Sequence, residues 1–133
     1  FWESDVEDNA FFHLEFDGNI LAQCHVSWTN WKNIFSFEIF GKDGYIKIEG
    51  LGGSYGIETL EVGYRQSCGG VPKIEIFEFS NNDNSWSLEW NEFKHAIMDN
   101  REPNGSGKDG YAVNAIVEAI YKSNEINKPI IIN

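Results

Sequence analysis

The feature of this chain that most constrains its fold is a change in hydrophobic period about two-thirds of the way along the sequence. From Asn9 to Phe79, apolar and polar side chains alternate within several short segments, a two-residue period typical of strands with one buried face. From Ser85 onward, apolar residues recur every three or four positions, which indicates amphipathic helices. A run of strands followed by a run of helices is typical of the α+β class.

The first part predicts six strands joined mostly by short turns. The expected strands cover residues 9–16, 20–28, 34–40, 45–49, 58–64 and 73–79. Asp17-Gly18-Asn19 and Lys42-Asp43-Gly44 contain the Asp-Gly pair that suits two-residue hairpin turns. Because strands joined by such turns pair antiparallel, we expect one open, mostly antiparallel sheet of about six strands.

The last third predicts two helices. Ser85 is the expected cap of the first helix, whose apolar stripe is Trp86, Trp90, Phe93 and Ile97. Ser106-Gly107-Lys108-Asp109 has the spacing of a capping box for the second helix. We expect both helices to pack on one face of the sheet, and residues 1–133 to form a single domain.

The charge balance excludes several classes of partner. The chain has 21 acidic and 10 basic side chains, a formal net charge of -11, which disfavours binding to nucleic acid or to an anionic membrane. It contains neither a membrane-spanning apolar run nor a signal-peptide pattern, so we expect a cytoplasmic protein whose Cys24 and Cys68 are reduced. Because Phe1 stands where an initiator Met is usual, we expect a piece of a longer protein or a processed product.

Two groups of residues suggest binding. The mixed strand face that contains Phe11, His13, Leu21, Gln23, His25 and Ser27 is too apolar for plain solvent, and predicts an interface in a homo-oligomer. Trp31 and Lys32, between two strands, have the chemistry to stack on and hydrogen-bond a sugar-like ligand. We therefore expect His25, Trp31 and Lys32 to line a substrate site, whereas Trp28 is interpreted as core packing.

Patterns for catalysis, metals and nucleotides are weak. The glycines from Gly50 to Gly56 have the spacing Gly-x-Gly-x-x-x-Gly and precede a strand, so they predict a flexible loop rather than a nucleotide site. Glu92-x-x-His95 imitates half of a di-iron motif whose second copy is missing. We expect no catalytic, cofactor-binding or metal-binding residue in this chain.

The order of several short motifs resembles the C-terminal domain of the Gfo/Idh/MocA family of nicotinamide-dependent oxidoreductases. The motifs are Val6-Glu7-Asp8-Asn9-Ala10, Asp17-Gly18-Asn19, Ser27-Trp28, the run 38–46, Trp90-Asn91-Glu92-Phe93, Ser106-Gly107-Lys108-Asp109-Gly110, the run 118–123 and Asn127-Lys128-Pro129-Ile130. The resemblance implies an open sheet with helices on one face, and a free sheet face used for oligomerisation. It also implies a separate N-terminal Rossmann domain that binds NAD or NADP and carries the catalytic lysine in a Glu-Lys-Pro motif. Lys128-Pro129 follows Asn127, so that role is not transferred to Lys128.

Three functions follow as expectations. The first is a substrate-side and oligomerisation domain, inactive alone, of an NAD(P)-dependent oxidoreductase acting on a sugar- or polyol-like substrate. The second is a stand-alone carbohydrate-binding module that uses Trp28 and Trp31. The third is a dimerisation module that needs only the open sheet face.

Overall fold

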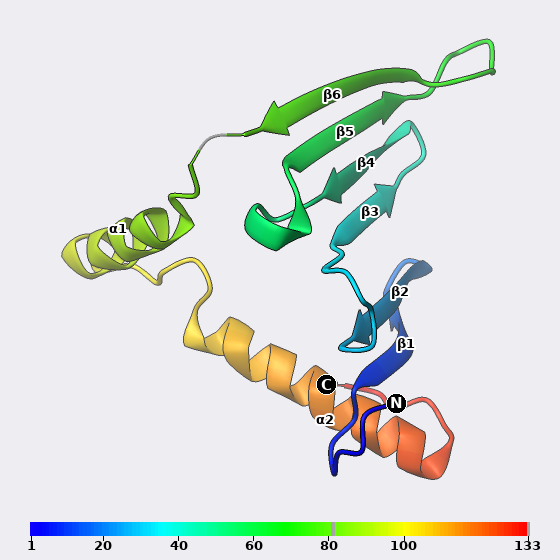
Figure 1. Ribbon diagram of the computed structural model, residues 1–133, viewed down its shortest axis with the longest axis vertical. Coiled ribbons are helices and arrows are strands. Elements are labelled where there is room, and N and C mark those ends of the chain that lie inside the picture. Colours follow the sequence, from blue (N-terminus) through cyan, green and yellow to red (C-terminus); the bar gives the residue numbers. More distant parts are fainter. Residues whose placement is uncertain (81, 133) are drawn as a thin grey trace. The chain divides into compact units, whose positions relative to one another are not determined.

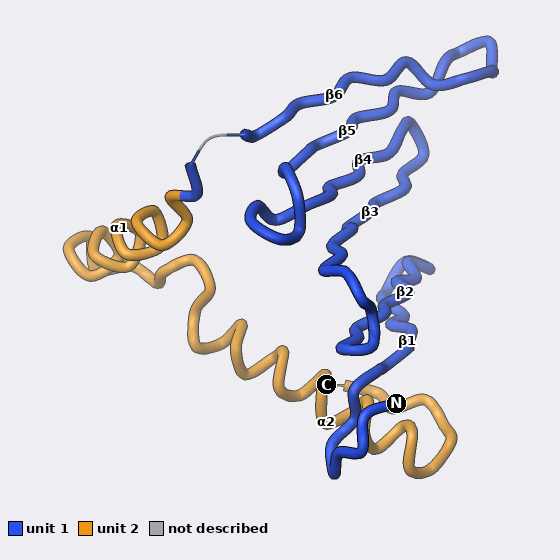
Figure 2. The backbone as a smooth tube through the Cα atoms, in the orientation of Figure 1, with its two compact units in different colours: residues 1–83 blue, residues 84–133 orange. Residues whose placement is uncertain are grey.

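The computed structural model describes residues 1–80 and 82–132, which divide into two compact units, residues 1–83 and 84–133 (Figures 1 and 2). Unit 1 contains β1 (Asn9–Phe16), β2 (Ile20–Ser27), β3 (Ser36–Phe40), β4 (Gly44–Glu49), a 3-10 turn η1 (Gly53–Tyr55), β5 (Glu58–Tyr64) and β6 (Lys73–Phe79). Unit 2 contains α1 (Ser85–Met98) and α2 (Gly107–Ile126). The α+β class and the open, antiparallel pairing are confirmed.

The six strands form two sheets rather than the single sheet expected. β1 and β2 pair with each other, and β3-β4-β5-β6 form a four-stranded meander. The ladder of β2 ends because the side-chain oxygen of Ser27 accepts the backbone N–H of Thr29 at 2.9 Å, a local turn that competes with strand pairing. The chain then runs without strand structure from Trp28 to Phe35, so β2 and β3 are not hairpin partners.

The β1–β2 hairpin has two distinct faces. Its turn holds Gly18 and Asn19 at positive φ, as the Asp-Gly-Asn sequence predicts. Successive side chains of a strand point to opposite faces. One face carries the half-buried Ala10, Phe12, Leu14, Ala22 and Cys24, and the other carries Phe11, His13, Gln23 and His25, which are exposed.

The four-stranded sheet is also two-faced. Directly paired residues share a face, so Phe37, Ile48, Leu60 and Phe77 form an apolar row across all four strands. On the opposite, polar face, Lys47 lies between Glu38 and Glu61 in a neighbouring row. The packing of the helices on a sheet face, and the single-domain organisation of residues 1–133, stay predictions.

The two helices begin differently. The expected capping box of α2 is confirmed: the Ser106 side chain accepts the Asp109 N–H, and the Asp109 carboxylate accepts the Ser106 N–H at 2.8 Å. The expected cap of α1 is wrong by one residue, because Ser85 is already helical and Asn84 is the N-cap, without a side-chain capping bond. In the described ranges, neither helix is long and apolar enough to cross a membrane.

Candidate functional site

Exposed tryptophans gather where the chain leaves β2. Trp28 is 81% exposed and Trp31 is 90% exposed, which contradicts the interpretation of Trp28 as core packing within this unit. The Trp2 indole N–H donates to the Trp28 carbonyl at 3.2 Å, and the Trp2 ring lies edge-on to the Trp31 ring at 6.4 Å. We call Trp2, Trp28 and Trp31 the tryptophan cluster.

Asp8 holds this cluster together. Its carboxylate accepts the Trp2 N–H at 2.7 Å, and its carbonyl accepts the Trp28 N–H at 2.7 Å. The hydrogen bond from the Trp2 N–H lowers the pKa of the Asp8 carboxyl. Asp8 therefore fixes Trp2 beside Trp31. The sequence does not predict this contact, because Asp8 and Trp2 are six positions apart in a segment without a periodic pattern.

His25 lies on the hairpin, apart from the tryptophans. Its ring stacks on Phe11 with centroids 4.1 Å apart and planes 7° apart. Its Nε2 is 2.8 Å from the side-chain oxygen of Asn9, and because an amide oxygen only accepts, Nε2 carries the hydrogen. Phe11 and His25 are direct cross-strand partners, so this stack belongs to the exposed hairpin face.

The structure does not join the three expected substrate-lining residues into one site. Trp31 and Lys32 are neighbours in the connection from β2 to β3, and both are exposed. Within residues 1–80, no hydrogen bond or ring contact links His25 to Trp31 or Lys32. The tryptophan cluster offers apolar ring faces and indole donors, a combination suited to ligands with both apolar and hydroxyl groups.

The glycine-rich loop does not fit a dinucleotide. It contains η1 and joins β4 to β5, which are antiparallel neighbours, and Gly52 and Gly56 take positive φ in it. A pyrophosphate site of the Rossmann type needs a strand, a tight turn and the N-terminus of a following helix. Here the loop leads directly into the next strand. We therefore assign no nucleotide-binding site to this loop.

The Glu92-x-x-His95 pattern also has another role. Both oxygens of Glu92 accept hydrogen bonds from the Arg101 guanidinium, at 2.6 and 2.8 Å, and this lowers the pKa of the Glu92 carboxyl to about 2. Within the ranges 1–80 and 82–132, no group of three or more His, Cys, Asp or Glu side chains is placed to hold a metal ion. Glu92 is thus part of an ion pair that ties the side of α1 to the loop that follows the helix.

Comparison with protein families finds a match for the segment that contains the tryptophan cluster, His25 and Lys32. Residues 1–47 match the model described as the GFO/IDH/MocA C-terminal domain. The family resemblance is confirmed for this segment, which is 47 of the 133 residues. The matched segment runs from Phe1 through β1, β2 and β3 into β4. No curated protein and no solved structure matches the chain.

Proposed function

We propose that this chain is the substrate-side and oligomerisation domain of an NAD(P)-dependent oxidoreductase that acts on a sugar- or polyol-like substrate. The observation that carries the proposal is the match of residues 1–47 to the GFO/IDH/MocA C-terminal domain. The hydride-transferring cofactor and the catalytic lysine belong to the Rossmann domain of the parent protein. The chain itself contributes binding surface and no catalytic residue.

The proposal is supported by the chemistry of the matched segment. It holds the exposed tryptophan cluster, the adjacent Lys32, and the hydroxyls of Ser27 and Thr29, which lie 2.7 Å apart. Rings with nearby hydroxyl and ammonium groups suit a polyol, which presents both C–H surfaces and hydroxyl groups. We propose that Trp31 and Lys32 contact the substrate. His25 lies on the exposed hairpin face, and we propose that it contributes to binding from there.

A calorimetric titration of the chain with NADH tests whether the cofactor site lies in another domain. We expect no saturable binding, because the glycine-rich loop lacks the strand–turn–helix geometry of a pyrophosphate site. Tight binding of NADH to this chain would contradict the proposal that the cofactor site lies in another domain.

Oligomerisation is proposed through the exposed hairpin face. Phe11 and Leu21 are both large, exposed apolar residues of this face. Sedimentation should show a concentration-dependent oligomer that Leu21→Glu weakens, whereas Val71→Glu, an equally exposed apolar position in the β5–β6 loop, should have little effect. A chain that stays monomeric at high concentration would overturn this part of the proposal.

A stand-alone carbohydrate-binding module is the second candidate, favoured by the exposure of Trp31. Saturable binding of a free monosaccharide by the chain would support it, provided that Trp31→Ala abolishes the binding. Trp86→Ala is the matched control, because Trp86 is similarly exposed, at 84%, but lies in α1. If the chain binds no free sugar, the oxidoreductase-domain proposal is favoured.

A further inference from the structure

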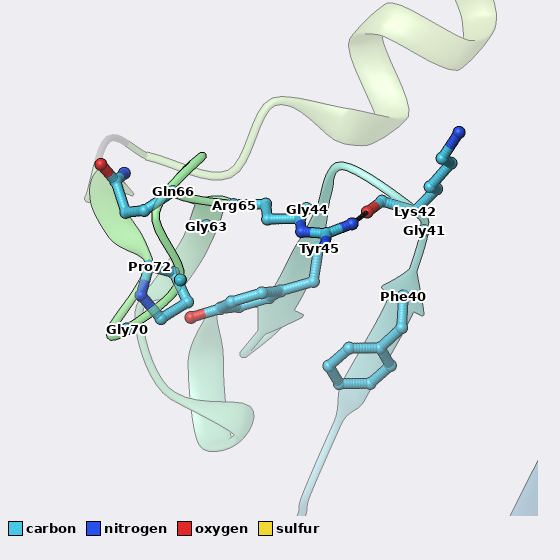
Figure 3. Close-up of a pocket in the computed structure, with 11 residues that line it drawn as sticks. Phe40, Gly41, Lys42, Gly44, Tyr45, Gly63, Arg65, Gln66, Gly70 and Pro72 are labelled. Atoms are coloured by element: carbon cyan, nitrogen blue, oxygen red, sulfur yellow. Dashed lines mark hydrogen bonds between the residues drawn. The ribbon is translucent and has the colours of Figure 1, made fainter.

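A hollow of about 300 Å³ lies at one end of the four-stranded sheet, outside the tryptophan cluster (Figure 3). It opens where the turn between β3 and β4 meets the loop between β5 and β6. Its lining includes Phe40, Tyr45, Gly63, Arg65 and Gln66. All of them belong to unit 1.

Two aromatic rings provide an apolar surface in this hollow. Phe40, Tyr45 and Gly63 are consecutive partners in one cross-strand row, on the polar face of the sheet. The Tyr45 ring lies directly on Gly63, where any Cβ would overlap ring carbons. The Phe40 ring is 5.7 Å from the Tyr45 ring and tilted by 32°. The glycine thus lets one ring lie flat on the strand, which leaves a shallow space beside both rings for a flat guest.

Arg65 provides a positive charge at the edge of the same hollow. Its backbone N–H donates to the Asp43 carbonyl at 2.9 Å, and its guanidinium donates to the Lys42 carbonyl at 3.5 Å. Both bonds end on uncharged carbonyls, so neither of them neutralises the guanidinium. Among the described residues that line the hollow, none is acidic. Asp43 lies beside a neighbouring hollow that Arg65 also lines.

We propose that this hollow binds a small planar carboxylate, an aromatic or heteroaromatic ring that carries a carboxyl group. The carboxylate would accept hydrogen bonds from the Arg65 guanidinium, whose fork matches the two oxygens of a carboxylate. The ring would pack against Tyr45 and Phe40, since aromatic groups prefer offset or edge contacts with one another. A volume of about 300 Å³ is at the lower end of ligand sites, which limits the guest to about one ring.

Benzoate is the probe, titrated into the full chain and followed by NMR chemical shifts. We expect saturable shifts at Gly63, Gln66 and the β5–β6 loop, and weaker binding of cyclohexanecarboxylate, which lacks a flat ring. Arg65→Gln should weaken benzoate binding about tenfold or more, because hydrogen bonds between charged groups are among the strongest in proteins. Circular dichroism of each variant checks that the sheet is intact.

Lys122→Gln is the matched control. It removes the same single positive charge, but Lys122 is an exposed residue of α2 and does not line the hollow. Its expected effect on benzoate binding is less than about twofold, as for an exposed charge screened by solvent and salt. Equal weakening by both variants would reduce the effect to general electrostatics and overturn the proposal, as would shifts that never saturate. This inference stands apart from the proposed function and does not depend on a Rossmann partner.

Discussion

Arg101 and Glu92 form a two-bond ion pair, in which Nη1 donates to Oε1 at 2.6 Å and Nη2 donates to Oε2 at 2.8 Å. Glu92 also accepts the backbone N–H of Asn104 at 3.0 Å. Parallel bonds of this kind fix both side chains in one geometry, unlike a single mobile contact. The pair therefore anchors the loop between α1 and α2 to the side of α1.

The ion pair makes the local structure of unit 2 dependent on pH. Hydrogen bonds from Arg101 and then from Asn104 lower the pKa of folded Glu92 from 4.5 to about 2. A lowered carboxyl pKa stabilises the folded state fully above the unfolded pKa, so this contribution should fade as pH falls from about 4.5 toward 2. Carboxyl NMR titration should show the low Glu92 pKa. In Arg101→Gln that pKa should rise, and an unchanged titration would contradict the role of the guanidinium.

Gly63 should be intolerant of even one methyl group. Its Cβ would overlap the Tyr45 ring, so Gly63→Ala should lower the free energy of unfolding by about 1–3 kcal/mol, the usual range for overpacking. Gly110→Ala is the control, because Gly110 lies in α2 with open space around it, and should stabilise by about 0.5–1 kcal/mol. Denaturant unfolding measures both. The cost of Gly63→Ala should shrink in a Tyr45→Ser background, and a cost independent of Tyr45 would exclude this explanation.

The two helix starts should respond differently to alanine. Ser106→Ala removes a side chain that accepts a capping bond, and should cost about 1 kcal/mol of helix stability. Asn84→Ala should cost less, because the Asn84 side chain makes no capping bond to α1. Thermal unfolding followed by circular dichroism compares the two variants. A larger loss for Asn84→Ala would contradict the capping assignment.

Asn127 ends α2 in the left-handed conformation, with φ of 52°. Asn127→Gly should leave stability nearly unchanged, because glycine adopts this conformation without a steric penalty. Asn127→Ala should cost about 1–2 kcal/mol, since a Cβ is crowded there. Chemical denaturation of the pair measures the difference, and equal stability of the two variants would argue against a left-handed cap.

Local signals in the sequence predicted the parts of the fold that local physics determines. The turn at Asp17-Gly18-Asn19 is confirmed because Gly18 and Asn19 can adopt positive φ. The capping box is confirmed because the Ser106 and Asp109 side chains bond backbone groups three residues away. The division into two sheets was not predicted. The turn that ends β2 depends on the hydrogen bond from the Thr29 N–H to the Ser27 hydroxyl, and the alternation of apolar and polar residues does not indicate this bond. Asn84 was missed as the N-cap because Ser85 is an equally good candidate by residue type.

The candidate sites were predictable only in part. Exposure of Trp31 and Lys32 agrees with their place between strands, and their role in binding stays a prediction. Trp2 and Arg101 were missed because each meets its partner across a loop without a periodic pattern. The hollow beside Arg65 was missed for a related reason: it is assembled from a turn and a loop about twenty residues apart, and only sheet pairing brings them together.

The contact of Tyr45 with Gly63 also belongs to one particular alignment of β4 on β5. If β4 slid by one residue along β5, Tyr45 would stand opposite Val62 or Tyr64, both of which carry a side chain where Gly63 has none. The same shift would turn Ile46 and Ile48 toward the side now occupied by Lys47, because side chains alternate across a strand. The flat contact of Tyr45 on Gly63 therefore exists in one alignment alone, the same alignment that keeps Ile46 and Ile48 on the apolar face.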